Sequence, residues 1–283
     1  MIVITGATGG LGALVVESLL QRVPADQVVA AVRNPEKAQA LGVQARAADY
    51  GDPASLERAF AGADVVLLIS GNEFGKRAEQ HANAIKAAVK AGVGRIVYTS
   101  APFADSGRMV LADEHKATEE ALLASGLTYT ILRNGWYHEN YAHDIAGAVE
   151  SGEISGSAGE GRVSSAARAD YAEAAAVVLT TDGHENKIYE LSGDTAWSFA
   201  ELTQEIARVS GRAVSYRNLT TEEHIARLVG VGFPEPVAAV FADVDANIAK
   251  GGVLDHTPGV LSALIGHPTR PVTDYIAELL KEK

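Results

Sequence analysis

Three glycines near the N-terminus, Gly6, Gly9 and Gly12, have the spacing of a loop that binds a phosphate. An apolar segment precedes them, and a segment with helical periodicity follows. In such a loop the first glycine permits a tight turn, the second lets the backbone approach a pyrophosphate, and the third lets the helix pack on the strand. The exposed amides and the helix dipole then favour an anion. The predicted phosphate-binding loop comprises Gly6, Ala7, Thr8, Gly9, Gly10 and Leu11.

A glycine-rich turn without a ligand is the alternative, but the strand before it and the helix after it favour a dinucleotide. The residue at the end of the next strand indicates whether this dinucleotide is NAD or NADP. Sites for NAD usually have a carboxylate there, which binds the ribose 2′-hydroxyl. Val28–Val32 is instead followed by Arg33, whose planar guanidinium suits a 2′-phosphate. NADPH is therefore expected rather than NADH, and a solvated loop arginine is the alternative.

Further candidate residues follow the later strands. Asp49 could accept a hydrogen bond from the adenine amino group, and Ser70, Gly71 and Asn72 follow the fourth strand, over which the cofactor should run. A second group follows the sixth strand, where open α/β sheets bind ligands. Asn134 and Glu139 could hydrogen-bond the carboxamide or ribose, or could stabilise the loop. Trp136 and Tyr137 could stack on a flat acceptor, with core packing as the alternative for Trp136.

The elements that must position these residues alternate along the chain. Continuous apolar strands alternate with helices, which is typical of a parallel sheet covered on both faces. We predict an α/β fold with a Rossmann-type doubly wound sheet in residues 1–135, and a smaller α+β substrate-binding part, intermingled with it, in residues 136–283. The predicted strands are Ile2–Ile4, Val28–Val32, Val65–Ile69, Ile96–Tyr98 and Tyr129–Leu132, and the predicted helices are Leu11–Arg22, Ala54–Ala61, Ala78–Ala91 and Ala112–Ser125.

Composition limits the partners. The net charge of −12 argues against nucleic acid or an anionic membrane as the main partner. The chain has no cysteine, which excludes thiol catalysis and cysteine-ligated metal, and the histidines lack metal-ligand spacing, so no metal is expected. No apolar run is long enough to cross a bilayer, and we expect a cytoplasmic protein without a signal peptide. The sequence leaves monomer and homodimer open.

Several segments together resemble the NmrA-like branch of the atypical short-chain dehydrogenases. They are TGATGGLG, VVAAVRNPEKA, AADYGD, YTSAP, DEHKATEEAL, TILRNGWYHENY and LIGHPT, and the resemblance covers essentially the whole chain. It is strongest to the type-two NAD(P)H:quinone oxidoreductases and weaker to the triphenylmethane dye reductases. The resemblance implies NADPH held by the glycine loop, by Arg33, by Ser70–Asn72 and by Asn134–Glu139, with a quinone close to Tyr137.

One family feature is absent. Many short-chain dehydrogenases pair a Tyr with a Lys four residues later, and the corresponding positions here are His115 and Glu119. His115 could donate a proton to the product, with Glu119 on the same helix face raising the imidazole pKa. The alternative is a merely structural helix. Ser100 could correspond to the dehydrogenase serine, but it has lost these partners.

The absence of the Tyr and Lys pair limits which hydride acceptors are expected. Reduction of a simple ketone makes a basic alkoxide that needs an acid beside it. A reduced quinone is a phenolate-like anion that can take its proton from water, and a cationic dye needs no acid at all. We therefore predict an enzyme, an NADPH-dependent quinone reductase without flavin that transfers hydride directly to small quinones. The alternatives are a reductase of dyes, azo compounds or imines, and a non-catalytic NADP sensor of the NmrA type.

Three local expectations concern residues after Tyr137. Asp170 is predicted to cap the N-terminus of a helix over Tyr171–Leu179, and Ser198 and Glu201 are predicted to form a capping box. Four histidines outside the proposed site are expected on the surface, namely His138, His143, His224 and His256.

Overall fold

The structure is a computed structural model that describes residues 1–281. The chain forms two compact units. Unit 1 consists of residues 1–105, 113–134 and 168–190, and unit 2 consists of residues 106–112, 135–167 and 191–281. The chain thus leaves unit 1 after residue 134 and returns to it at residue 168.

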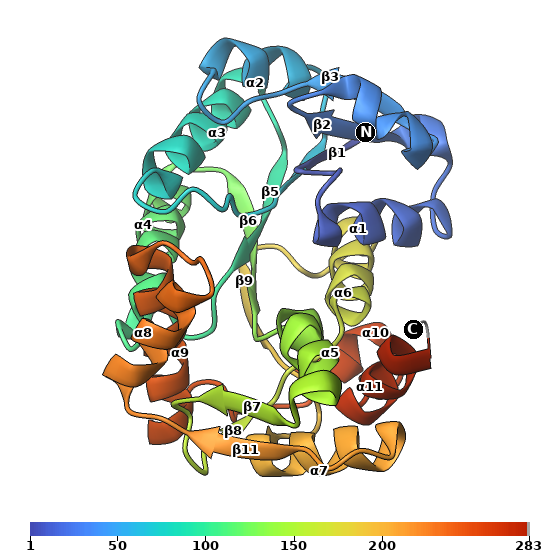
Figure 1. Ribbon diagram of the computed structural model, residues 1–283. Coiled ribbons are helices and arrows are strands. Elements are labelled where there is room, and N and C mark those ends of the chain that lie inside the picture. The colour runs from blue at the N-terminus through green and yellow to red at the C-terminus, as the bar shows by residue number, and fades with distance from the viewer. Residues whose placement is uncertain (282–283) are drawn as a thin grey trace. The chain divides into compact units, whose positions relative to one another are not determined.

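Unit 1 contains a seven-stranded sheet with the order β3-β2-β1-β4-β5-β6-β9 (Figure 1). The six strands from β3 to β6 are paired in parallel, so their carboxyl ends meet at one edge. Because the order reverses direction beside β1, this edge contains a topological switch point, where open α/β sheets bind ligands. The strands are β1 Ile2–Thr5, β2 Val28–Val32, β3 Gln44–Ala47, β4 Val65–Leu68, β5 Arg95–Ser100, β6 Thr128–Asn134 and β9 Lys187–Leu191.

Helices cover both faces of this sheet. Figure 1 shows α2, α3 and α4 along one face, and α1 and α6 along the other. Between the sheet and the first group lies a closely packed core that includes Phe60, Tyr98, Leu122 and Ile131. The predicted doubly wound α/β fold is therefore confirmed. The helices are α1 Gly10–Leu20, α2 Pro53–Phe60, α3 Arg77–Ala91, α4 Val110–Ala124 and α6 Arg168–Thr180, with short 3₁₀ turns at η1 Ala25–Gln27, η2 Pro35–Leu41 and η3 Ala104–Ser106.

The start of α6 corrects one expectation. Asp170 does not cap this helix, because α6 begins two residues earlier at Arg168, and Asp170 lies buried in its first turn. An acidic side chain in the first turn is favourable beside the positive end of the helix dipole. The segment is helical as predicted, but the helix starts at Arg168 and not at the predicted Tyr171.

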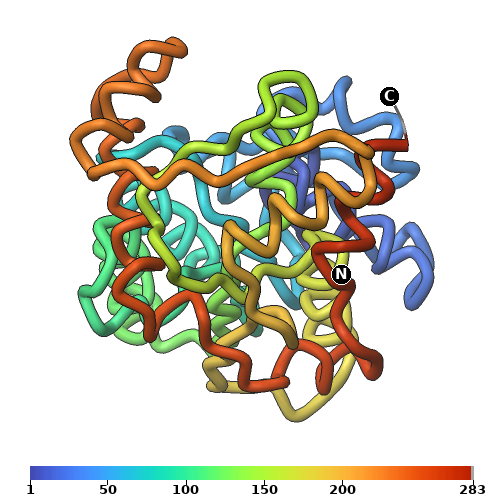
Figure 2. Tube along the Cα trace, turned by 60° about the horizontal axis from the view of Figure 1, so that its bottom comes forward, coloured from blue at the N-terminus to red at the C-terminus, as the bar shows by residue number. Residues whose placement is uncertain are grey.

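Unit 2 is built from two small sheets and several helices. Strands β8 and β10 pair antiparallel, and β7 and β11 pair in parallel. Figure 2 follows α8 into α9 as the orange part of the trace, and α11 as the red part. The predicted capping box is confirmed at the start of α7, where Ser198 and Glu201 satisfy each other's backbone N–H. The elements are η4 His138–Tyr141, α5 Ala142–Ser151, β7 Glu153–Gly156, β8 Arg162–Val163, β10 Trp197–Ser198, α7 Phe199–Ser210, β11 Ser215–Asn218, α8 Thr221–Gly230, α9 Glu235–Lys250, α10 Val260–Ile265 and α11 Val272–Lys281.

Among residues 1–281, no helix combines the length and the apolar character that a membrane crossing requires.

Candidate functional site

The loop between β1 and α1 has the geometry that close approach of a ligand requires. Gly6 has a φ of +60°, a conformation that favours glycine, and its carbonyl accepts a 2.9 Å hydrogen bond from the Gly9 N–H. A Cβ on Gly12 would lie 2.3 Å from the Gly6 carbonyl oxygen, so only glycine allows α1 to pack this closely on the loop. These observations support the roles expected of the first and third glycines.

The start of α1 is suited to an anion. Thr8, Gly9 and Gly10 are exposed, whereas Ala7 and Leu11 are buried and anchor the loop. The first turn of α1 contains no acidic residue, and no side chain caps it. Its backbone N–H groups and its positive dipole end therefore face no carboxylate from their own turn, which leaves them available to a phosphate.

The ends of β2 and β3 carry Arg33 and Asp49, both of which are exposed. The side chain of Arg33 makes no hydrogen bond or ion pair with any residue in the part of the chain that the structure describes. One carboxylate oxygen of Asp49 accepts a 2.8 Å hydrogen bond from the Gly51 N–H, which fixes the side chain. Both residues follow parallel strands and so lie at the same sheet edge as the glycine loop.

The segment after β4 is held by residues that the sequence did not single out. The Ser70 N–H donates to Thr99, and the Gly71 N–H donates to Nε2 of His81 at 3.0 Å. The Gly71 carbonyl accepts from Nε of Arg77 at 2.8 Å. Both polar groups of the Gly71 backbone are thus fixed by side chains from α3, while Asn72 remains exposed. Helical periodicity gave no signal for this, because His81 and Arg77 look like ordinary helix residues.

The hydrogen bonds of His81 define its protonation. The Thr118 hydroxyl donates to the Glu114 carbonyl, so it accepts from Nδ1–H of His81 at 3.0 Å. Nε2 accepts from Gly71, which leaves the ring neutral. Complete burial, and then the charge of Arg77, lower the pKa of His81 to about 3. His81 is therefore a fixed neutral bridge between α3, α4 and the loop after β4.

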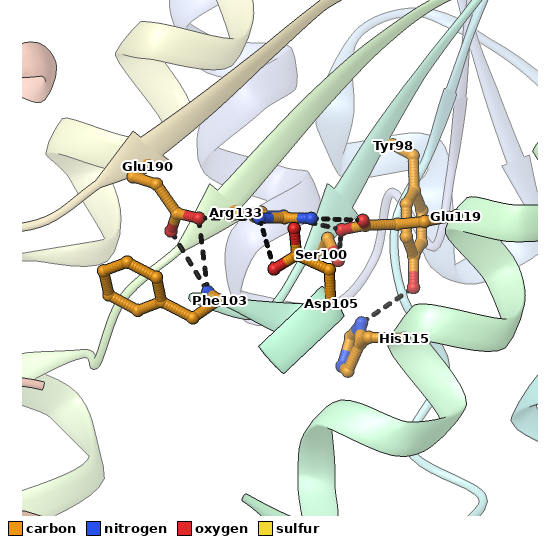
Figure 3. Close-up of polar contacts among 8 residues, drawn as sticks. All are labelled: Tyr98, Ser100, Phe103, Asp105, His115, Glu119, Arg133 and Glu190. Atoms are coloured by element: carbon orange, nitrogen blue, oxygen red, sulfur yellow. Dashed lines mark hydrogen bonds and ion pairs between the residues drawn. The ribbon is translucent and has the colours of Figure 1, made fainter. Parts of the chain in front are cut away.

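At the positions of the absent Tyr and Lys, the structure shows a buried ion-pair network (Figure 3). Arg133 from β6 binds both carboxylate oxygens of Glu119 at 2.6 and 2.9 Å. Ser100 donates to the same carboxylate at 2.6 Å, and on its other side Arg133 reaches Glu190 at 2.8 Å and Asp105 at 3.1 Å. Glu119 therefore balances the charge of Arg133 and fastens α4 to β5 and β6.

His115 lies beside this network and contacts a different partner. Its Nδ1 is 2.7 Å from the hydroxyl of Tyr98 (Figure 3). Burial, and then the nearby charge of Arg77, lower the pKa of His115 to about 3. The expectation that Glu119 would raise this pKa was wrong, because the Glu119 carboxylate is neutralised by Arg133 and the ring is removed from water.

The backbone of the segment after β6 pairs with Ala166 within unit 2. The Trp136 carbonyl accepts from the Ala166 N–H, and the His138 N–H donates to the Ala166 carbonyl, both at 3.0 Å. Trp136, Tyr137 and Glu139 are half-buried, whereas Asn134, the last residue of β6 in unit 1, is buried. The backbone at Tyr137 is thus fixed. The roles of Tyr137, Asn134, Trp136 and Glu139 in binding stay predictions.

His138 contradicts its predicted surface position, since its side chain is buried. Nε2–H donates to the Arg270 carbonyl at 2.9 Å, so Nδ1 accepts from the Ser165 hydroxyl at 2.8 Å. Burial lowers the pKa of His138 to about 4. His224 is also buried, beside Asp245 and Ser157, whereas His143 and His256 are exposed as expected. Single histidines gave no periodic signal that could separate these two groups.

Within residues 1–281, no group of three or more His, Asp or Glu side chains could hold a metal ion. Within unit 1, the glycine loop, Arg33, Asp49, Ser70–Asn72 and Asn134 follow or end parallel strands and so lie at one sheet edge. His115 lies on α4 and is engaged with Tyr98. The arrangement of this edge, with an uncapped helix start and an exposed arginine two strands away from β4, fits a phosphorylated dinucleotide.

A model of the NAD(P)H-binding family matches residues 6–182. The chain belongs to this family. Over 282 residues it is 51% identical to quinone oxidoreductase 2 of Escherichia coli strain K12, covering 99% of this chain and 98% of that protein.

Two solved structures are similar over the full length. The crystal structure of the NADPH-dependent quinone oxidoreductase QOR2 from Escherichia coli, complexed with NADPH, has a TM-score of 0.96 and 50% identity, and the match covers 99% of this chain and 100% of that chain. The triphenylmethane reductase of Citrobacter sp., complexed with NADP(H), has a TM-score of 0.94 and 42% identity with the same coverage. The predicted resemblance to both groups is confirmed.

Proposed function

We propose that this chain is an NADPH-dependent quinone oxidoreductase that transfers hydride directly to small quinones. The observation that carries the proposal is the full-length match, at 50% identity and a TM-score of 0.96, to a quinone oxidoreductase complexed with NADPH. The geometry of unit 1 supports it, because the exposed loop amides and Arg33 offer separate sites for a diphosphate and a 2′-phosphate.

Bound NADPH would supply the hydride. In the proposed site the loop Gly6–Leu11 binds the diphosphate, Arg33 the 2′-phosphate, and Asp49 the adenine amino group. Ser70, Gly71 and Asn72 support the cofactor along the sheet edge, on a backbone that His81 and Arg77 hold in place. Asn134 and Glu139 orient the nicotinamide end, and Trp136 and Tyr137 stack on the acceptor. These residues act mainly by alignment, the proximity contribution to catalysis.

The protonation of His115 supports a quinone as acceptor. A histidine with a pKa of about 3 is a neutral imidazole near neutral pH, which is a much weaker proton donor than an imidazolium. A reduced quinone resembles a phenolate, which water can protonate at neutral pH because the conjugate acid titrates near that of tyrosine. We therefore infer that water supplies the second hydrogen. The reaction adds one hydride and one proton to the quinone and leaves NADP⁺.

Dye reduction is the second candidate, favoured by the 42% identity to the Citrobacter triphenylmethane reductase. A cationic dye is neutralised by hydride at its central carbon and needs no proton donor, so the same site would serve it. The two candidates differ only in the acceptor. We further propose that the protein works in the cytoplasm without flavin, with residues 136–283 supplying most of the acceptor contacts.

The test is a panel of benzoquinones, naphthoquinones and triphenylmethane dyes, with NADPH oxidation followed by absorbance under anaerobic conditions. We expect turnover with quinones by protein whose visible spectrum shows no flavin. Stereospecifically deuterated NADPH should transfer its label to the product of a cationic dye, which would demonstrate direct hydride transfer. Tight NADPH binding without oxidation by any acceptor would contradict the proposal and favour the sensor alternative.

A further inference from the structure

A second arginine lies against the phosphate-binding loop and comes from a distant part of the chain. Arg168 is the first residue of α6, and α6 packs beside α1 in unit 1 (Figure 1). A Cβ built on Gly10 would lie 3.5 Å from Nη1 of Arg168, 3.7 Å from its Cδ and 3.9 Å from its Cζ. The guanidinium therefore passes directly beside the first residue of α1.

This position combines two features that attract the same ligand. The exposed residues Thr8, Gly9 and Gly10 lead into a helix start without an acidic or capping side chain. The Arg168 guanidinium adds a positive charge beside it, on a half-buried side chain whose Cδ also lies close to the first residue of α1. A planar guanidinium forms paired hydrogen bonds with phosphate oxygens, whereas the helix start alone offers only partial charges.

The geometry points to Arg168 as a ligand of the dinucleotide diphosphate, an inference that rests on the proposed NADPH site. It assigns the two arginines to different phosphates. Arg33 follows β2, where the ribose of the adenosine is expected, and reads the 2′-phosphate. Arg168 lies at the start of α1, where the diphosphate is expected, and binds the part that NADPH and NADH share.

The assignment predicts how each variant discriminates among ligands. In Arg168→Gln, the affinities for NADPH, NADH and ADP-ribose should all fall by roughly 10- to 100-fold, the range for loss of a hydrogen-bonded charge. The affinity for adenosine 2′-phosphate, which has no diphosphate, should not change. Arg168→Lys keeps the charge but loses the paired geometry, and should recover part of the affinity.

A matched control addresses the packing of α6 on α1. Arg22, which follows α1, reaches Glu173 on α6 at 3.1 Å and so links the same two helices away from the loop. Arg22→Gln should leave the affinities for all four ligands unchanged. If Arg168 only supports helix packing, Arg168→Gln would lower the unfolding midpoint and leave the dissociation constants as in the wild type, which would overturn the inference.

The measurement is calorimetric titration, or competition against NADPH fluorescence, with thermal unfolding of every variant recorded in parallel. Loss of adenosine 2′-phosphate binding in Arg168→Gln would also overturn the assignment, because it would place Arg168 at the 2′-phosphate. These titrations measure binding and not turnover. A chain that binds NADPH through Arg168 but reduces no quinone would therefore contradict the proposed function alone.

Discussion

Arg33 extends from the end of β2 into solvent, and no residue from 1 to 281 neutralises its guanidinium. In Arg33→Asp a cation that attracts the 2′-phosphate becomes a carboxylate that repels it. We expect the affinity for NADPH to fall by roughly 10- to 100-fold and that for NADH to change little. Titration with both cofactors checks this. Lys37→Asp, an equal charge change at a nearby exposed position, is the control, and equal losses for both cofactors in Arg33→Asp would contradict the role of Arg33.

His115 tests the source of the proton. Because its pKa is lowered to about 3, its neutral form dominates throughout the physiological range and it contributes no titration there. His115→Ala should therefore slow quinone reduction by less than about tenfold, below the range of a general acid. The rate should show no new dependence on pH between about 5 and 8.

Tyr98→Phe is the control for this experiment, since it removes the same buried hydrogen bond from the other side. Similar small losses in both variants would indicate a structural contact. A loss on the order of a thousandfold in His115→Ala alone would make the imidazole the proton donor.

At the scale of the elements, an ion pair joins β6 to α4. This pair, Arg133 with Glu119, is the most heavily buried ion pair of unit 1 among those described. Removing one partner leaves an uncompensated charge in the interior. Glu119→Gln or Arg133→Met should each lower the free energy of unfolding by about 3–5 kcal/mol, whereas the double variant should lose less than the sum. Urea denaturation of the four proteins measures this coupling, and additive losses would show that the pair is not coupled.

The same elements show what the sequence could and could not predict. The turn of the β1 loop and the exposed position of Arg33 after β2 were predictable, because their signals lie within the first strand–helix–strand unit. Nothing local in the sequence indicated that strand β9 would lie beside β6. The ion pair of Glu119 could not be predicted for the same reason. Its partner Arg133 lies on β6, and Glu190, another partner of Arg133, lies on β9.

At the scale of the whole molecule, four buried histidines among residues 1–281 have pKa values lowered to about 3 or 4, namely His81, His115, His138 and His224. Unfolding returns each pKa to about 6.5, so between about pH 6.5 and pH 4 the unfolded chain binds more protons than the folded one. Acidification across that window therefore lowers the free energy of unfolding, by about 2–3 kcal/mol for each histidine.

Asp245 acts in the opposite direction. Burial raises its pKa to about 6, so the folded chain keeps a proton that the unfolded chain releases. Burial also raises the pKa of Asp144. Four histidines outweigh these two carboxyl groups, and the net effect of moving from about pH 7 to about pH 5 should be a loss of several kcal/mol. Urea titrations at the two pH values measure it. Equal free energies of unfolding would contradict the buried, neutral state of these rings, and His138→Gln should make the dependence shallower.

The discontinuous path of unit 1 has a consequence for synthesis on the ribosome. Helix α6 and strand β9 come from residues 168–190, after the chain has already entered unit 2. A nascent chain that ends near residue 135 has β6 as an open edge and α1 without its neighbour α6. Such an edge recruits other strands. The seven-stranded sheet is therefore complete only after residue 190 has been synthesised. A gene fragment that ends near residue 135 would encode an aggregation-prone polypeptide instead of an independently folding domain.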